Sequence, residues 1–170
     1  RHLISQQKAM SLIWDVGEDD VFLNYLPWHH SFGGLFERFM SLYTGAELCL
    51  DEGRGKDIDR LLRNWDAFEP TIFFSIPQVH DKLVTRAAES KDADEIFWGG
   101  RLRLAFTASA PLPGRVEAAY REHGIPVLEG WGLIEASPCV TVSTPDRSWH
   151  RGCVGFPLPG VKFRINHNQE

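Results

Sequence analysis

Cysteine is scarce in this chain of 170 residues. Its three cysteines, Cys49, Cys139 and Cys153, lie far apart and form no C-x-x-C pair, which excludes a disulfide framework and a zinc knuckle. Long hydrophobic runs are absent as well, since none approaches the ~20 residues that a membrane-spanning helix requires. The sequence does not open on a signal-peptide pattern, and by default we expect a cytoplasmic protein without a transmembrane segment.

Basic residues are in the minority, and they do not cluster. The formal net charge is −5 at pH 7, so the chain lacks the basic surface with which proteins bind nucleic acids. With 43% hydrophobic and 12% aromatic residues, the chain can bury one sizeable core. The sequence starts at Arg1 without a methionine, and we expect it to be the central part of a longer protein.

Short apolar runs alternate with amphipathic segments along most of the chain. Runs that are typical of buried strands occupy residues 21–26, 46–50, 71–76, 102–106 and 126–128. Helical patterns occupy residues 35–43, 57–68, 77–88 and 113–123. This alternation predicts an α/β fold, a mainly parallel sheet with helices on both faces, over residues 1–138. Strand patterns without helices at 139–143 and 161–165 predict a small β appendage over residues 139–170.

Glycine and tryptophan alternate directly after the apolar run that ends at Leu128. Residues 129–135 read Glu-Gly-Trp-Gly-Leu-Ile-Glu. The glycines permit a tight turn in which backbone can approach a ligand, Trp131 offers a flat stacking face, and Glu135 offers a carboxylate suited to Mg²⁺. Open α/β sheets bind ligands at this end of a strand. The segment therefore indicates a nucleotide site, although a plain strand-to-loop turn also fits these residues.

The first expected strand, at residues 21–26, is followed at residues 27–33 by the sequence Pro-Trp-His-His-Ser-Phe-Gly. Adjacent histidines point in different directions, so at most one of them faces a given site. Taken alone, the pair fits a surface or structural role, and no third ligand at suitable spacing supports a metal site. Trp28 and Phe32 are suited to line an apolar substrate pocket.

Small residues follow the expected strand at 102–106, where residues 107–113 read Thr-Ala-Ser-Ala-Pro-Leu-Pro. Small side chains let a planar ring lie against the backbone, and the helix that follows favours an anion at its N-terminus. A close-packed strand–helix turn fits the same residues. Because the strands are expected to be parallel, their ends share one edge, so we expect residues 30, 109–111 and 131–132 to meet at one cleft.

In order and spacing, these motifs resemble those of the adenylate-forming (AMP-binding) superfamily, which includes acyl-CoA synthetases, luciferases and peptide-synthetase adenylation domains. PWHHSFG is similar to a strand-end motif of the family whose substrate-pocket histidine falls on His30. TASAPLP is similar to the small-residue motif that holds adenine, and EGWGLIE to the motif G-[YW]-G-x-T-E. GCVGFPLPG, at residues 152–160, is similar to the segment that follows, so the resemblance covers the whole chain.

The resemblance implies a two-step reaction. A carboxylate attacks the α-phosphorus of ATP, pyrophosphate leaves, and a thiol, usually that of coenzyme A, takes the acyl group from the acyl-adenylate. ATP, Mg²⁺, coenzyme A and a small carboxylic acid are thus implied, and PWHHSFG favours a fatty or aryl acid over an amino acid. Two alternatives stay open: an acyl-AMP ligase that serves a carrier protein, and a non-catalytic relative that acts as a scaffold. Association into a homodimer is also left open.

The resemblance implies roles for single residues as well. Glu135 would bind Mg²⁺, and His30 would lie between the acyl pocket and the phosphates. The ATP and AMP site would be formed by Ser109, Ala110, Pro111, Gly130, Trp131 and Gly132. The acyl pocket would be formed by Trp28, His30, Phe32 and Gly132.

Two features depart from the family pattern. Ile134 stands where the motif usually has threonine, so a hydroxyl donor to the α-phosphate is missing from this catalytic position. By analogy with oxyanion-hole donors, such a loss costs about 2.7–4 kcal/mol of transition-state stabilisation. In addition, the resemblance places the phosphate loop before residue 1, and the ribose-binding aspartate and the C-terminal domain with its lysine after residue 170. We expect residues 1–170 alone to be inactive.

Overall fold

A seven-stranded sheet forms the centre of the computed structural model, which describes residues 2–136, 138–145 and 152–164. The strand order is β2-β1-β3-β4-β5-β6-β7. The strands are β1 (Val21–Asn24), β2 (Glu47–Leu50), β3 (Ile72–Ser75), β4 (Leu104–Thr107), β5 (Val127–Gly132), β6 (Cys139–Val142) and β7 (Phe156–Pro157). Strands β1 to β5 pair in parallel, whereas β6 and β7 extend the sheet as antiparallel strands.

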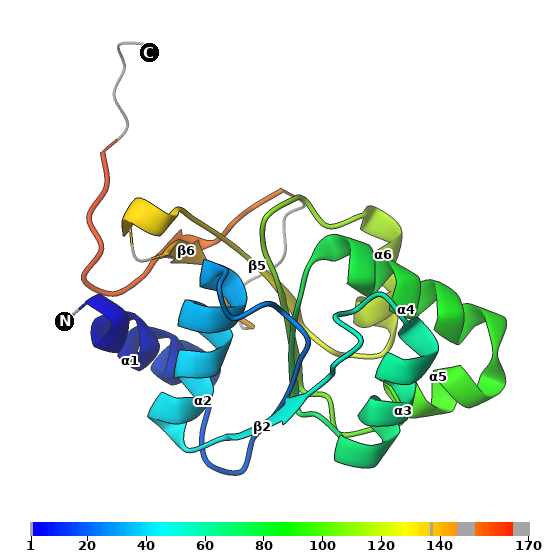
Figure 1. The fold of residues 1–170 in the computed structure, drawn as a ribbon. Helices are drawn as coiled ribbons and strands as arrows, with labels where there is room; N and C mark the ends of the chain where they lie inside the picture. The colour runs from blue at the N-terminus through cyan, green and yellow to red at the C-terminus, as the bar shows by residue number, and fades with distance from the viewer. Residues whose placement is uncertain (1, 137, 146–151, 165–170) are drawn as a thin grey trace.

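Helices cover both faces of the sheet. They are α1 (His2–Trp14), α2 (Arg38–Thr44), α3 (Ile58–Phe68), α4 (Pro77–Glu89), α5 (Lys91–Trp98) and α6 (Gly114–Glu122). A π-helical turn, η1 (Ser31–Glu37), leads into α2, and a 3₁₀ turn, η2 (Ile134–Ala136), follows β5. Helices α1 and α2 lie on one side of the sheet, and α3 to α6 lie on the other (Figure 1). Within the described residues, none of the helices has the length and apolar character needed to cross a bilayer.

The expected α/β architecture is confirmed. All five runs that predict parallel strands form neighbouring strands of the same sheet. The signals at helix ends also act as the sequence suggests: the Asp57 carboxylate accepts a hydrogen bond from the Arg60 N–H at 2.9 Å, and Pro77 occupies the first turn of α4. Helix α6 ends just before Gly124, whose φ of +69° is a left-handed conformation that glycine adopts without strain.

The expected β appendage is present, but its second strand lies earlier in the chain than residues 161–165. The expected strand at 161–165 is wrong for residues 161–164, and Ile165 lies outside the described residues. The Val161 N–H donates to the Leu158 carbonyl at 2.9 Å in a turn, so it is not available to a ladder. Strand β7 lies earlier, at Phe156–Pro157, and pairs with β6.

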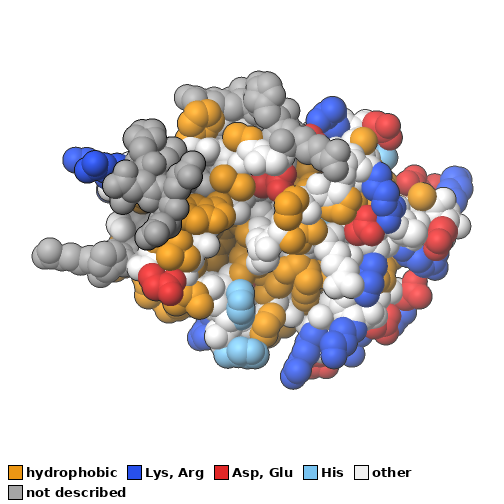
Figure 2. All heavy atoms as spheres, turned by 90° about the horizontal axis from the view of Figure 1, so that it is seen from above, with side chains coloured by type: hydrophobic (Ala, Val, Ile, Leu, Met, Phe, Trp, Pro, Cys, Tyr) orange, Lys and Arg blue, Asp and Glu red, His pale blue; other side chains and the backbone are white. Residues whose placement is uncertain are grey.

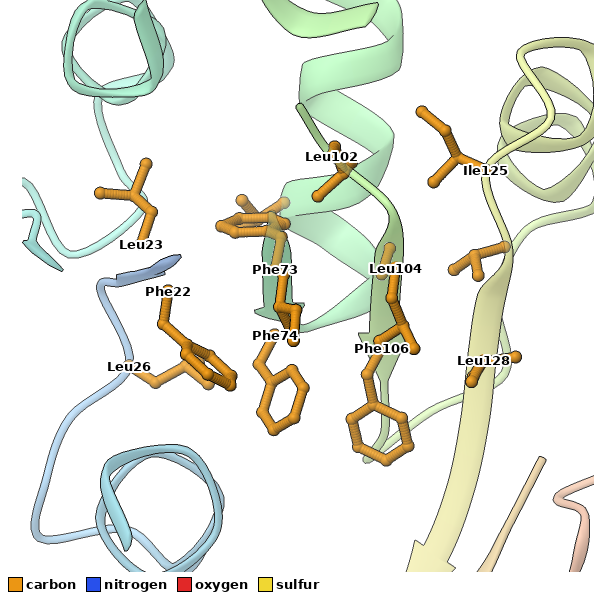
Figure 3. Close-up of a cluster of buried hydrophobic side chains, with 14 of the residues drawn as sticks. Phe22, Leu23, Leu26, Phe73, Phe74, Leu102, Leu104, Phe106, Ile125 and Leu128 are labelled. Atoms are coloured by element: carbon orange, nitrogen blue, oxygen red, sulfur yellow. The ribbon is translucent and has the colours of Figure 1, made fainter. Parts of the chain in front are cut away.

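Aromatic side chains from the central strands pack on both sides of the sheet. Phe73 and Phe74 are successive residues of β3, and their rings lie on opposite sides (Figure 3). Phe73 packs edge-on against Trp65 of α3, with ring centroids 4.8 Å apart. Phe74 lies beside Phe106 of β4 at 5.2 Å, on the side of α1 and η1. Residues of the same strand thus bind both helical layers to the sheet.

His80 joins α4 to α6 and β4 in the interior. Its Nδ1 lies 2.8 Å from the Tyr120 hydroxyl, and its Nε2 lies 3.4 Å from the Phe106 carbonyl oxygen. The imidazole is fully buried, and burial lowers its pKa from 6.5 to about 4. The ring is therefore neutral at pH 7, with Nε2–H donating to the carbonyl and the tyrosine hydroxyl donating to Nδ1.

This burial predicts a pH-dependent stability. Between pH 6.5 and about 4 the unfolded chain binds a proton at His80 that the folded protein does not bind, so stability is full above pH 6.5 and falls as the pH drops. The contribution of His80 amounts to about 3 kcal/mol over this range. Replacement by a non-ionisable amide, His80→Gln, should flatten the pH dependence of urea unfolding in this range. An unchanged slope would contradict the assignment.

Candidate active site

A cavity of about 500 Å³ lies at the carboxyl ends of the central parallel strands. Four separate parts of the chain line it, and within the described residues these are His30, Ser31, Phe32, Phe36, Phe106, Ala108, Ser109, Ala110, Pro111, Glu129, Gly130, Trp131, Gly132, Leu133, Ile134, Pro138, Cys139, Gly152 and Val154. Seen from above relative to Figure 1, hydrophobic side chains gather in the middle of the molecular face, while most charged ones lie toward the right (Figure 2). The expected convergence of residues 30, 109–111 and 131–132 is thus observed.

His30 is the N-cap residue of the helical turn η1 and is oriented by it. The backbone at His30 is extended, with φ −94° and ψ 144°, and its Nδ1 accepts a hydrogen bond from the Phe32 N–H at 3.2 Å. The His30 carbonyl accepts a second bond, from the Gly34 N–H at 2.8 Å. Because Nδ1 is an acceptor, the ring hydrogen of neutral His30 is assigned to Nε2. This side chain of the cavity wall can therefore donate a hydrogen bond to an anionic oxygen.

Two glycines of β5, Gly130 and Gly132, line the cavity, and neither has room for a side chain. A Cβ at Gly130 would lie 2.7 Å from the Phe106 ring, and one at Gly132 would collide with the backbone of Pro138. The pairing of β5 with β6 shifts register between Trp131 and Gly132, as at a β-bulge. Trp131 remains 51% exposed, so its indole is free to stack on a flat ligand.

The turn after β4 holds an unusual backbone conformation. Ser109 has a φ of +81°, a left-handed value that a residue with a Cβ rarely adopts. Such conformations persist where the surroundings enforce them, and they are frequent at ligand sites. Ser109, Ala110 and Pro111 follow one another along the cavity wall. The turn thus presents backbone and small side chains, the surface that a planar ring can approach.

Glu129 connects this turn to β5. Its Oε2 accepts a hydrogen bond from the Leu112 N–H at 3.3 Å, and its side chain also lines the cavity. Burial raises the pKa of the Glu129 carboxyl, an effect that the Leu112 hydrogen bond opposes and the nearby charge of Glu117 reinforces. The carboxyl group therefore holds a proton to higher pH than an exposed glutamate does.

Two residues of the expected site do not line this cavity. Trp28 lies outside it: its Nε1 donates to the Asn24 Oδ1 at 3.0 Å, and the Arg38 guanidinium lies over its ring, 4.3 Å from the centroid. The Trp28 ring thus contacts Asn24 of β1 and Arg38 of α2. Glu135 is exposed in η2, next to Ile134, which does line the cavity and is 69% exposed.

Glu135 fits a magnesium ion held mainly by a substrate. Within the described residues, no three His, Cys, Asp or Glu side chains are grouped to hold a metal. Mg²⁺ typically takes one or two carboxylates, keeps several waters and completes its shell with substrate phosphates. One exposed carboxylate directly after the lining residue Ile134 is consistent with that coordination.

Ten of the lining residues were not among the expected site residues, and three of these ten are Phe36, Phe106 and Glu129. Phe36 belongs to an apolar stripe that resembles an ordinary amphipathic helix, whereas the chain forms a π-helical turn there. The sequence predicts Phe106 to be a buried core residue of a strand. The structure confirms this, and Phe106 also lines the cavity. Glu129 directly precedes Gly130 in the glycine motif, and this position in the sequence could have indicated that it lines the site.

Comparisons with known proteins show the family to which the chain belongs. The sequence pattern of the family described as "AMP-binding enzyme" matches residues 1–170. Long chain acyl-CoA synthetase 3 of Arabidopsis thaliana is 27% identical over 96% of this chain and 30% of its own length. Anthranilate–CoA ligase of Pseudomonas aeruginosa is 28% identical over 75% of this chain and 23% of its own length. The chain thus spans less than a third of these relatives.

Solved structures show the same fold. A malonyl-CoA ligase with methylmalonyl-CoA and AMP bound superposes with a TM-score of 0.80 at 24% identity, over 94% of this chain and 34% of that one. O-succinylbenzoate coenzyme A synthetase of Bacillus subtilis, with ATP and magnesium, gives a TM-score of 0.80 at 20% identity, over 99% of this chain and 34% of that one. With the family pattern matched along its whole length, the chain belongs to the AMP-binding enzyme family.

Proposed function

We propose that the chain is part of an ATP-dependent carboxylic acid–CoA ligase, which forms an acyl-adenylate and then a thioester. The observation that supports this most strongly is the shared cavity: the turn at 109–111, the turn at 130–132 and His30 all line it, although up to about 100 residues separate them along the chain. Relatives named as acyl-CoA and anthranilate–CoA ligases support the same reaction class. Cytoplasmic location and homodimer formation stay predictions from the sequence.

The adenine ring is assigned to the space between Trp131 and the 109–111 turn. Trp131 is half exposed and offers a stacking face, while the turn offers backbone and small side chains. Gly130 packs against the Phe106 ring and Gly132 against the Pro138 backbone, so the two glycines fix the position of the β5 backbone on either side of Trp131. The Leu112–Glu129 hydrogen bond keeps the turn at a fixed distance from β5.

The reacting groups are assigned to the part of the cavity between His30 and Ile134. His30 would donate from Nε2 to an oxygen of the carboxylate or the α-phosphate, which orients the acid for in-line attack. Mg²⁺ bound by Glu135 and the phosphates would neutralise charge on the phosphoryl oxygens. Ile134 supplies no hydroxyl at this position, so side-chain donation to the phosphate is weaker than in relatives that have threonine there.

Pyrophosphate exchange by the full-length protein tests the proposed function. ATP–pyrophosphate exchange that depends on an added carboxylic acid would establish the first step, and acyl-CoA formation would establish the second. Exchange without transfer to coenzyme A would favour an acyl-AMP ligase that serves a carrier protein. Absence of exchange with every fatty and aryl acid would favour a non-catalytic relative.

Removal of the Glu135 carboxylate should impair adenylation. In the full-length enzyme, Glu135→Ala should lower the single-turnover rate of acyl-adenylate formation by about 10²-fold or more, since a charge-neutralising group is lost where phosphate charge develops. Glu122, an exposed residue at the end of α6, provides the control, because Glu122→Ala removes the same charge away from the cavity. Equal rates for wild type and Glu135→Ala would contradict the role of this carboxylate.

Restoring the missing hydroxyl should increase the rate. Ile134→Thr places a donor beside the α-phosphate, and single-turnover adenylate formation should rise by up to about 10²-fold. The side chain is 69% exposed, so the change should leave the fold intact. Ile134→Val alters shape without adding a donor and should show no comparable gain. A flat or lower rate for Ile134→Thr would mean that backbone N–H groups already hold the phosphate.

A further inference from the structure

Three buried phenylalanine rings form one wall of the cavity. Phe32 of η1 is 7% exposed, Phe36 of the same turn is 3% exposed, and Phe106 of β4 is 1% exposed, yet all three line the cavity. The Phe36 and Phe106 rings stack at 5.2 Å with an interplanar angle of 24°, and Phe32 meets Phe106 edge-on at 5.8 Å. This aromatic wall, Phe32–Phe36–Phe106, is therefore a packed surface and not three loose side chains.

Further rings close the space behind the aromatic wall. Phe74 of β3 lies 5.2 Å from Phe106 and 5.5 Å from Phe36, and Trp14 of α1 lies 4.9 Å from Phe106. Phe74 and Trp14 are 0% and 2% exposed. Phe74 and Phe106 stand side by side beneath the sheet (Figure 3). A long alkyl tail could pass through this wall only by displacing close-packed core rings, which protein interiors resist.

The strand side of the wall is closed as well. The Phe106 ring lies so near the Gly130 backbone that a Cβ there would come within 2.7 Å of it. The ring thus fills the space beside Gly130. The cavity lined by the described residues measures about 500 Å³, which is within the roughly 300–1,000 Å³ of ligand pockets, and the three phenylalanine rings bound it on the side of η1 and β4.

Charges around the cavity select against a second carboxylate. Within the described residues, its lining includes no Lys or Arg, and its one carboxyl group is that of Glu129. Among the described lining residues, a second carboxylate would find no Lys or Arg to pair with and would share the cavity with the Glu129 carboxyl group. Aromatic walls of this kind favour flat rings, which pack edge-to-face or offset-stacked against phenylalanine.

We propose that the acid is a compact aryl monocarboxylate, and that Phe32, Phe36 and Phe106 set the upper limit on its size. This inference rests on the proposed function, since it names the substrate of that same cavity. It distinguishes the aryl acids from the long-chain fatty acids, two classes that the sequence motifs leave together. It also sets this chain apart from the dicarboxylate ligases whose fold it shares.

The test is acid-dependent ATP–pyrophosphate exchange by the full-length protein with benzoate, hexanoate, palmitate and malonate. We expect kcat/KM for benzoate to exceed the values for palmitate and malonate by at least about tenfold, the scale on which a pocket rejects a substrate that does not fit. Palmitate or malonate activated as well as benzoate would overturn the inference while leaving the ligase function in place. No exchange with any acid would overturn both.

A pair of variants tests the wall itself. Phe36→Ala removes a ring from the aromatic wall, and the ratio of hexanoate to benzoate kcat/KM should rise at least about fivefold. Phe36→Leu, a milder change, should shift the ratio in the same direction. Phe97→Leu alters an equally buried phenylalanine on the opposite side of the sheet and should leave the ratio unchanged. A folded Phe36→Ala protein, judged by circular dichroism, with an unchanged ratio would overturn the assignment of the wall.

Discussion

Phe106 lies where the sheet, one helical layer and the cavity meet. Its ring packs on Trp14, Phe36 and Phe74, and its backbone carbonyl lies 3.4 Å from the Nε2 of the buried His80. The same ring lies against Gly130 and forms part of the cavity wall. Because one side chain serves the core and the site together, the shape of the cavity is fixed by core packing and cannot change without cost in stability.

A second constraint acts on the turn that follows His30: it is held by hydrogen bonds among the side chains of Asn24, Trp28 and Glu37. Glu37, at the end of η1, is fully buried, and burial raises its pKa well above that of an exposed glutamate, against the opposing effect of its hydrogen bond from Asn24. The Asn24 side chain donates to Glu37 and accepts from the Trp28 indole N–H. These hydrogen bonds fix η1 relative to the end of β1, and they therefore also fix His30, the N-cap residue of η1.

Sequence periodicity identified the elements that have one clear apolar face. The five parallel strands and helix α3 with its Asp57 cap follow directly from such patterns. Helix α1 could not be found in this way, because its buried face includes Gln6 and Gln7. The Gln6 amide donates to the Cys139 carbonyl at 2.6 Å, and the Gln7 amide to the Leu35 carbonyl at 2.8 Å. Polar side chains that are buried by partners far along the chain leave no periodic hydrophobic signal.

The same difference between local sequence patterns and contacts of distant residues applies to the site. The side that we propose for the nucleotide is readable from the sequence because glycines, small residues and an aromatic residue at strand ends are local features, and Ser109, Gly130 and Trp131 all line the cavity. The side that we propose for the acid is formed by residues that are distant in the sequence. Phe36 and Phe106 meet only because a π-helical turn brings one of them against β4, and neither has a sequence context unlike that of an ordinary core residue. Motifs can therefore indicate the reaction class, whereas the choice of acid depends on packing between distant segments.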